Sequence, residues 1–247
     1  MTRKTNEGAV GVIAGTGASE YFTVLREKRV VTGYGEAVAY SVEGGSYYLL
    51  PRHGPRHGVP PHMVNYRANI ECLRRLGVGR VIATSAVGSM DPGFRVGQLG
   101  LVGQFLDFTK RRVETYFDKE VRHTDMTNPY SETMNGTVSD ASRDLGVKLK
   151  TGLVYVCVDG PRFETAAEIK MFRLLGGDVV GMTGVPEVVL AREAGLEYSA
   201  LAVATNWAAG IQQKVSHDEV VSVMKKTGPM MKRLIEASIQ RLEGGSV

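Results

Sequence analysis

Two polar residues, Glu164 and Asn206, each follow an apolar run that has the composition of a buried β-strand. The runs are residues 153–158 and 198–204. In open α/β sheets, ligands bind beyond the carboxyl ends of the strands. A carboxylate there accepts hydrogen bonds from ring N–H groups, whereas an amide both donates and accepts. The pair therefore predicts recognition of the edge of a planar heterocycle such as a 6-oxopurine.

Each of these residues also has a simpler structural explanation. A carboxylate such as Glu164 is common in the first turn of a helix, and Asn206 is a residue type that favours turns. Taken singly, those roles are the more common ones. Residues elsewhere in the chain decide between the two interpretations.

Anion-binding residues follow three further apolar runs, at residues 9–14, 47–50 and 81–84. Backbone N–H groups in a glycine turn face an anion readily, and a hydroxyl can join them. Arg offers a bidentate fork to phosphate, and His adds a charge-assisted hydrogen bond. The candidate phosphate-binding residues on these three loops are Gly15-Thr16-Gly17, Arg52-His53 and Ser85, with Arg56 and His57 as weaker candidates.

Other interpretations of the same residues are disfavoured. A lone glycine turn is usually a plain turn, and Glu20 stands where a dinucleotide-binding fingerprint needs its third glycine. His53, His57 and His62 are close in sequence, but no second cluster completes a tetrahedral zinc site, so no metal is expected. Ser-His-Asp hydrolysis lacks its Gly-x-Ser-x-Gly turn.

The composition is that of an ordinary globular protein: 247 residues, 43% hydrophobic and 23% charged. The length fits one α/β domain spanning residues 1–247. A net charge of +4 suits an anionic small substrate, whereas nucleic-acid binding would need a clustered basic face. The short basic run Lys110-Arg111-Arg112 is predicted to be a solvated loop edge, so no nucleic-acid partner is expected.

Cysteine usage and the apolar pattern indicate the compartment. Cys72 and Cys157 lie in apolar surroundings without a Cys-x-x-Cys motif, as is typical of core thiols in a reduced compartment. Residues 1–7 are polar and lack the apolar core of a signal peptide. No apolar stretch has the length of a membrane span. A soluble cytoplasmic protein with no membrane partner is expected.

Strand-like and helix-like segments alternate along the chain, which favours a mixed, mainly parallel sheet covered by helices on both sides. Capping residues mark where the helices begin and end. From about Asp107 to Pro129 the pattern is irregular and charged, and it predicts a long functional loop with strand pieces. The expected helix starts are Asn65, the capping boxes Thr165-x-x-Glu168 and Ser216-x-x-Glu219, and Pro186, and the expected ends are Gly77, Gly176-Gly177 and Gly195.

From Gly11 to about Arg241, the chain resembles the family of trimeric purine nucleoside phosphorylases and methylthioadenosine phosphorylases. The order and separation of several motifs carry this resemblance. It implies a nucleoside phosphorylase fold, inorganic phosphate as co-substrate with no other cofactor and no metal, and a homotrimer or dimer of trimers. The motifs are Gly15-Thr16-Gly17, Leu50-Pro51-Arg52-His53-Gly54, Asn65-Tyr66-Arg67-Ala68-Asn69, Ser85-Ala86-Val87-Gly88-Ser89, Gly160-Pro161-Arg162-Phe163 and Gly181-Met182-Thr183-Gly184-Val185-Pro186-Glu187.

At the base site the sequence departs from the methylthioadenosine branch, which most of these motifs resemble. Family members that take adenine bases carry Asp at the position of Asn206 and a second Asp where this chain has Ala208. Methylthioadenosine members carry a small hydroxyl residue at the position of Glu164. Members that take 6-oxopurines carry Glu and Asn, as this chain does.

The resemblance also implies roles for other residues. His217 would lie over the 5′ substituent, where a His suits a hydroxyl and an apolar residue suits a thioether. His123 would complete a neighbouring subunit's sugar pocket, and Met182 would pack under the ribose. The implied phosphate-binding residues are Thr16, Arg52, His53, Ser85, Ala86 and Thr183, and the implied base- and sugar-binding residues are Phe163, Met182, Thr205, His217 and His123, beside Glu164 and Asn206.

The expected activity is phosphorolysis of 6-oxopurine nucleosides, inosine and guanosine, to free base and ribose 1-phosphate. Glu164 would hold the N1–H, and Asn206 would stabilise negative charge on the departing purine. The alternative enzyme is a 5′-methylthioadenosine or 5′-methylthioinosine phosphorylase. Most of the family motifs favour this alternative, whereas the residues at the base site oppose it. A non-catalytic nucleoside-binding protein is the third hypothesis, and phosphate-dependent turnover would exclude it.

Overall fold

The computed structural model of the protein describes residues 8–43 and 47–244. The polar segment at residues 1–7, from which the absence of a signal peptide was predicted, lies outside this part of the chain. Among the described residues, no helix combines the length and the apolar character that crossing a membrane requires.

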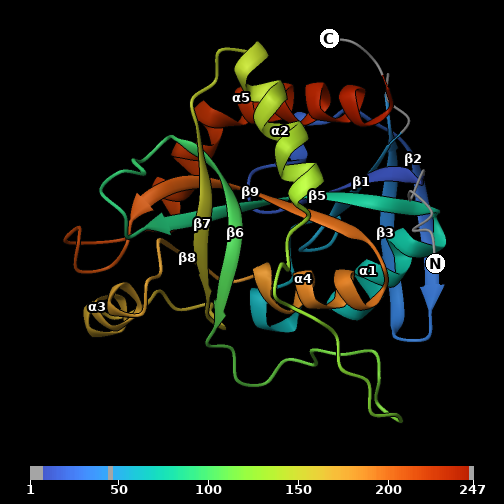
Figure 1. The fold of residues 1–247 in the computed structure, drawn as a ribbon, viewed down its shortest axis with the longest axis horizontal. Coiled ribbons are helices and arrows are strands. Elements are labelled where there is room, and N and C mark those ends of the chain that lie inside the picture. The colour runs from blue at the N-terminus through green and yellow to red at the C-terminus, as the bar shows by residue number, and fades with distance from the viewer. Residues whose placement is uncertain (1–7, 44–46, 245–247) are drawn as a thin grey trace.

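Nine strands within the described residues form one sheet, in the order β2-β3-β4-β1-β5-β8-β7-β6-β9. β5 also pairs with β9, so the five strands β5, β8, β7, β6 and β9 close into a ring. The remaining strands extend from β5 as an open sheet (Figure 1). The strands are β1 (Ala9–Ala14), β2 (Val24–Thr32), β3 (Gly35–Val42), β4 (Tyr48–Pro51), β5 (Val78–Ser89), β6 (Leu99–Asp107), β7 (Leu149–Cys157), β8 (Val179–Gly181) and β9 (Glu197–Trp207).

Strand directions are mixed. β1 runs parallel to β4 and β5, β5 is parallel to β9, and β7 is parallel to β6 and β8. The hairpin β2–β3 and the pairs β3–β4, β5–β8 and β6–β9 are antiparallel. The prediction of an α/β fold with a mixed, mainly parallel sheet is confirmed.

Helices cover both faces of the sheet, as predicted (Figure 1). α1 and α4 pack on one face through Leu73 and Val188. α2 and α5 pack on the other through Met134 and Leu234. The helices are α1 (Tyr66–Arg75), α2 (Glu132–Asp144), α3 (Ala166–Leu174), α4 (Gly184–Glu193) and α5 (His217–Leu242), and two short 3-10 turns lie at Ser19–Tyr21 and Pro61–Met63.

Two of the predicted helix starts have the expected caps. The Asn65 side chain accepts a hydrogen bond from the Ala68 N–H at the start of α1. At α3, Thr165 accepts from the Glu168 N–H while the Glu168 carboxylate accepts from the Thr165 N–H. This reciprocal capping box fixes the chain directly after Glu164.

The start of α5 differs from the prediction in one respect. Ser216 accepts from the Glu219 N–H, so the N-cap is confirmed. The Glu219 carboxylate instead accepts from the Gln212 amide at 2.8 Å. Glu219 therefore bonds to the Gln212 side chain in place of the Ser216 N–H that a full capping box requires.

The regular part of α4 begins where the sequence predicted. Gly184 is the first residue assigned to the helix, but Val185 has an extended backbone. Helical geometry therefore starts at Pro186, whose fixed φ suits a first helical position. The helix ends before Gly195, which has a φ of +75°.

Two strands extend further than predicted. The apolar runs stop at Thr84 and Ala204, but β5 continues to Ser89 and β9 to Trp207. Ser85 and Asn206 therefore lie inside strands and not beyond their ends. The backbone ladder between β5 and β9 continues through both positions because it does not depend on side-chain polarity.

The segment between β6 and α2 is a long loop, but the predicted strand pieces do not occur in this described segment. Its backbone groups bond to other elements instead. The Tyr116 N–H, for example, donates to the Glu193 carboxylate at 2.7 Å. The interpretation of the basic run as a solvated loop edge holds for Lys110 and Arg111, which are exposed, and is wrong for Arg112, whose side chain is 3% exposed.

Candidate active site

A cavity of about 600 Å³ lies where β5 and β9 meet the loops that follow β1, β4, β7 and β8. This volume is in the range of small-molecule sites. The cavity brings together most of the predicted site residues, but not Gly17, Arg56 or His123, the last of which is exposed on the long loop. Those in the lining are Thr16, Arg52, His53, Ser85, Ala86, Phe163, Glu164, Met182, Thr183, Thr205, Asn206 and His217.

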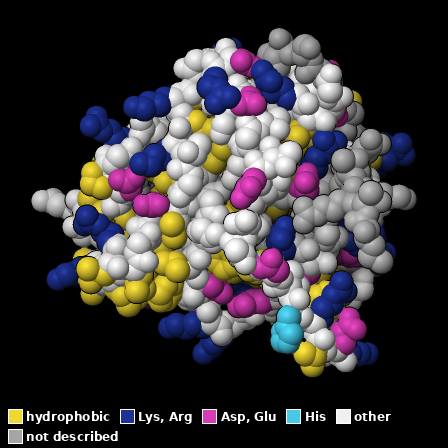
Figure 2. Space-filling view, viewed as in Figure 1, with side chains coloured by type: hydrophobic (Ala, Val, Ile, Leu, Met, Phe, Trp, Pro, Cys, Tyr) yellow, Lys and Arg dark blue, Asp and Glu magenta, His cyan; other side chains and the backbone are white. Residues whose placement is uncertain are grey.

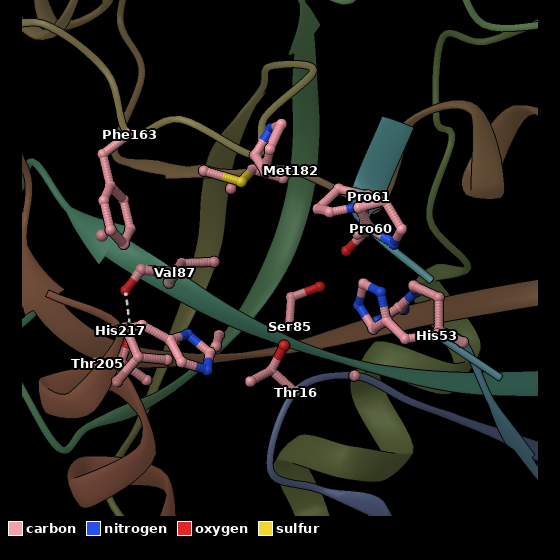
Figure 3. A pocket seen from close by; sticks show the side chains of 18 of the residues that line it. Thr16, His53, Pro60, Pro61, Ser85, Val87, Phe163, Met182, Thr205 and His217 are labelled. Carbon is pink, nitrogen blue, oxygen red and sulfur yellow. Dashed lines mark hydrogen bonds between the residues drawn. The ribbon is translucent and has the colours of Figure 1, made fainter. Parts of the chain in front are cut away.

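Different groups of residues lie toward the two ends of the cavity (Figure 3). Phe163 and Thr205 lie at one end, and Thr16, Ser85 and His53 lie toward the other. Met182 and His217 face the space between the two groups from different elements. A ligand with a flat apolar part, a central part and an anionic end matches this order.

Arg52, which lines the cavity together with Thr16, Ser85 and His53, is held rigidly. Its side chain is 0% exposed, and its Nε and one terminal nitrogen donate to Glu187 at 2.6 and 2.7 Å. The other terminal nitrogen donates to the Thr84 carbonyl at 2.8 Å. A guanidinium has five N–H donors, so these contacts use three of them beside the cavity that Arg52 lines.

Gly15 is required for this placement. A Cβ built on Gly15 would lie 2.7 Å from a terminal nitrogen of Arg52 and 2.9 Å from the Thr84 carbonyl oxygen. The Gly15 N–H donates to the Thr84 hydroxyl at 2.9 Å. The glycine turn after β1 therefore makes room for the Arg52 side chain beside the cavity.

Glu187 was missed as a site residue by sequence reasoning. It is fully buried on α4, and its carboxylate also accepts from the Tyr198 hydroxyl at 2.7 Å. Burial alone would lower the pKa of Arg52, but Glu187 outweighs it and raises that pKa. The sequence did carry one signal for Glu187, because it is the one acid inside the apolar run 184–191. An acid buried in such a run is expected to be paired with a positive charge.

His53 is a neutral imidazole in the unliganded protein. One ring nitrogen, Nδ1, lies 2.8 Å from the Val59 carbonyl, which only accepts, so Nδ1 carries the proton. Burial, reinforced by Arg52, lowers the pKa of His53 to about 4. The other nitrogen, Nε2, is thus an acceptor, and the predicted charge-assisted bond requires a proton that the free enzyme does not hold at pH 7.

His57, a weaker candidate in the sequence, also lines the cavity. Its Nε2 lies 3.3 Å from the Thr16 hydroxyl, and its backbone has a φ of 52°. Burial, then the charges of His217 and Arg52, lower the pKa of His57. Arg56 does not line this cavity, and in the described part of the chain no three His, Cys, Asp or Glu side chains form a metal-binding group.

At the other end of the cavity, burial raises the pKa of Glu164 above its ordinary value. The loop that carries Glu164 is fixed on both sides. Arg162 donates to the Glu168 carboxylate at 2.7 and 2.8 Å. Gly160 has a φ of +65°, and a Cβ there would lie 2.5 Å from the sulfur of Met182, so this loop packs directly on the residue predicted to lie under the ribose.

The Asn206 side chain is 4% exposed and held by its neighbours. Its amide nitrogen donates to the Trp207 carbonyl at 2.9 Å, and its amide oxygen accepts from the Thr205 hydroxyl at 3.0 Å. An amide has two N–H donors, so one stays available to a ligand. A Cβ on Gly88 would lie 3.2 Å from this nitrogen, which makes Gly88 part of the wall.

Some apolar lining residues were not predicted. Pro60 and Pro61 lie near His53 (Figure 3), and Val220 comes from the first turns of α5. Short apolar residues in a loop or helix carry no sequence signal that separates a cavity wall from ordinary packing.

Comparison with known proteins agrees with this geometry. The family model described as the phosphorylase superfamily matches residues 9–240. The chain is 48% identical to the probable 6-oxopurine nucleoside phosphorylase of Moorella thermoacetica, over 93% of this chain and 92% of that protein. It is 44% identical to the probable S-methyl-5′-thioinosine phosphorylase of Methanothermobacter thermautotrophicus, over 95% and 84%.

A solved structure shows the same fold. Methylthioadenosine phosphorylase from Schistosoma mansoni, in complex with adenine, superimposes with a TM-score of 0.89 at 29% identity, covering 97% of this chain and 93% of that one. The protein is therefore a member of the phosphorylase superfamily, and the family prediction is confirmed.

Proposed function

We propose that this enzyme catalyses phosphorolysis of 6-oxopurine nucleosides, releasing the free base and ribose 1-phosphate. One observation carries the proposal: Glu164 and Asn206 share a cavity with Thr16, Arg52 and Ser85. A purine edge and an oxyanion would thus be held in one cavity. The name of the Moorella thermoacetica relative agrees with this base choice.

The base end suits a purine that carries an oxygen at C6. The Glu164 carboxylate accepts from the N1–H of hypoxanthine or guanine and, in guanine, from the exocyclic amine as well. The free N–H of Asn206 donates to N7 or O6. Adenine has no N1–H, so it would leave the half-buried carboxylate of Glu164 without a donor, which is costly.

The end of the cavity with Thr16, Ser85 and His53 suits a phosphate dianion. The hydroxyls of Thr16, Ser85 and Thr183 supply donors, and the buried guanidinium of Arg52 adds positive charge beside them. The Nε2 of His53 accepts from a protonated phosphate oxygen. Because these groups come from separate loops, they orient phosphate toward the sugar before reaction.

The proposed reaction follows from the groups at the two ends of the cavity. A phosphate oxygen forms a bond to C1′ of the ribose as the bond from C1′ to N9 of the purine breaks. The sugar gains oxocarbenium character, as in glycoside hydrolysis, and the phosphate dianion stabilises it. Negative charge collects on the purine, where Asn206 donates a hydrogen bond to it. Side chains and phosphate balance both charges, so we propose no metal and no further cofactor.

A second candidate substrate is a 5′-methylthio nucleoside with the same base. The apolar side chains of Pro60, Pro61 and Val220 line the same cavity as His217. An apolar wall suits a thioether, whereas His217 suits a hydroxyl. The Methanothermobacter thermautotrophicus relative is named for 5′-methylthioinosine. We rank inosine and guanosine first because His217 is the polar group at that position.

We further propose that the enzyme is a cytoplasmic homotrimer or a dimer of trimers. His123 is exposed and does not line the cavity of its own subunit, as expected of a residue that completes a neighbour's site. Hydrophobic side chains gather over α3, the helix that follows the Glu164 loop (Figure 2). Leu174 and Leu175 there are 81% and 54% exposed, and such patches mark interaction surfaces.

The buried unpaired thiols of Cys72 and Cys157 suit a reducing compartment.

Two assays test these proposals. Base release from inosine and guanosine should require phosphate and yield one ribose 1-phosphate per base. Equal release without phosphate would make the protein a hydrolase, and binding without turnover would make it a nucleoside-binding protein. Sedimentation should show a trimer or a multiple of one, whereas a fully active monomer would remove His123 from the site.

A further inference from the structure

Arg112 is a buried cation in the long loop between β6 and α2. Its side chain is 3% exposed and lies over the ring of Tyr66, 5.3 Å from the ring centroid. The nearest carboxylate, that of Asp159, is 3.6 Å away and 29% exposed. Burying a charge this completely is costly unless hydrogen bonds compensate for the lost water.

Backbone carbonyls from two separate turns provide that compensation for the terminal nitrogens, whereas the Nε of Arg112 has no hydrogen-bond partner among the described residues. One terminal nitrogen of Arg112 donates to the Met182 carbonyl at 2.7 Å and to the Asp159 carbonyl at 3.0 Å. The same nitrogen is 3.3 Å from the Val158 carbonyl, and the other donates to the Val185 carbonyl. A single planar guanidinium thus joins residues 158–159 to residues 182–185.

Both turns carry cavity residues. The first leads through Gly160 directly into the segment with Phe163 and Glu164, and the second contains Met182 and Thr183. The two turns already touch at Gly160 and Met182. Arg112 joins the same two turns without lining the cavity, so it sets the spacing between the Glu164 loop and Met182.

We propose that Arg112 is a positioning residue for the nucleoside half of the cavity. It touches no substrate and acts by fixing Met182 relative to the Glu164 loop; the substrate assignment rests on the proposed function. The donors for phosphate lie mostly on β1, β4 and β5 loops that Arg112 does not contact. Loss of Arg112 should therefore impair the use of nucleoside more than the use of phosphate.

The test compares Arg112→Lys and Arg112→Ala with Arg111→Ala, the exposed neighbour on the same loop. Lys keeps the charge but lacks the planar fork that reaches carbonyls on two turns. We expect kcat/KM for inosine to fall on the order of 100-fold in both Arg112 variants, since a displacement of about 1 Å costs that much. The KM for phosphate should change by less than about threefold, and Arg111→Ala should match the wild type.

Hydrogen exchange gives a readout that does not depend on activity. In Arg112→Lys, amides of residues 158–164 and 181–185 should exchange faster, while those of β1 and α5 keep their wild-type protection. Wild-type kinetics in Arg112→Lys, or equal losses for nucleoside and phosphate with faster exchange throughout the chain, would overturn the proposal. A wild type that does not cleave inosine would instead refute the proposed function, and the exchange experiment would still decide whether Arg112 joins the two turns.

Discussion

Replacing Glu187 by Gln tests how the phosphate end of the cavity is built. Glu187 and Arg52 are both 0% exposed and share two hydrogen bonds of 2.6 and 2.7 Å. The substitution keeps the shape but leaves Arg52 as a buried charge without a counterion. Removing one partner of a buried ion pair costs about 3–5 kcal/mol, so the free energy of unfolding should fall by that amount.

The assay is urea denaturation at fixed protein concentration, with Tyr198→Phe and Arg52→Gln as companions. Tyr198→Phe removes one hydrogen bond to the same carboxylate and should cost less, about 1.5–3 kcal/mol. The double variant Glu187→Gln with Arg52→Gln should be less destabilised than the sum of the two single variants, because the unpaired charge is gone.

Kinetics provide a second measurement on the same variant. Because Gln accepts only one of the two guanidinium bonds, Arg52 loses its fixed orientation, and the KM for phosphate should rise by at least ~10-fold. A loss of stability below about 1 kcal/mol, strict additivity in the double variant and an unchanged KM for phosphate would together refute this account of the site.

Three further outcomes are expected. The pKa of His53 is about 4 in the folded protein against an unfolded value of about 6.5, so the unfolded chain binds the proton first. As pH falls from 6.5 to 4, proton binding by the unfolded chain should lower the free energy of unfolding by up to about 3 kcal/mol. In His53→Gln the free energy of unfolding should depend less on pH; the same pH dependence in variant and wild type would contradict this expectation. His217→Val should shift the inosine to methylthioinosine kcat/KM ratio toward methylthioinosine by a few-fold to about tenfold, and a constant ratio would place His217 elsewhere. Glu164→Gln should lower kcat/KM for guanosine by roughly 10- to 100-fold, more than for inosine, since guanosine loses two bonds to the carboxylate; equal retention of both would exclude Glu164 from the base site.

Local patterns made most of the architecture predictable. Apolar runs marked β1, β4, β5, β7 and β9, and the caps Asn65, Thr165 and Ser216 marked the starts of α1, α3 and α5, because each is encoded within a few residues. The polar residues that follow the runs pointed to one cavity, and Glu164 and Asn206 do line it together. The strand ends were misplaced at Ser85 and Asn206 because a side chain that faces a cavity breaks the apolar pattern without breaking the backbone ladder.

The partners of the buried charges, and the burial of Arg112, were the features that sequence reasoning missed. Arg52 and Glu187 are 135 residues apart in sequence, and Arg112 bonds carbonyls 46 to 73 residues away. No local pattern encodes such pairings, and a charged residue in a loop is usually exposed. The closing of β5, β8, β7, β6 and β9 into a ring is likewise set by the pairing of β5 with β9, which lie far apart in the chain.

The most direct test of the central claim is kcat/KM for inosine and for adenosine at saturating phosphate. The paired Glu164 and Asn206 predict that inosine is preferred, by as much as about 10⁴-fold, since a site built around hydrogen bonds rejects a ligand that leaves them unmade. A preference for adenosine or methylthioadenosine would contradict the account of the base site while leaving the phosphorylase fold in place.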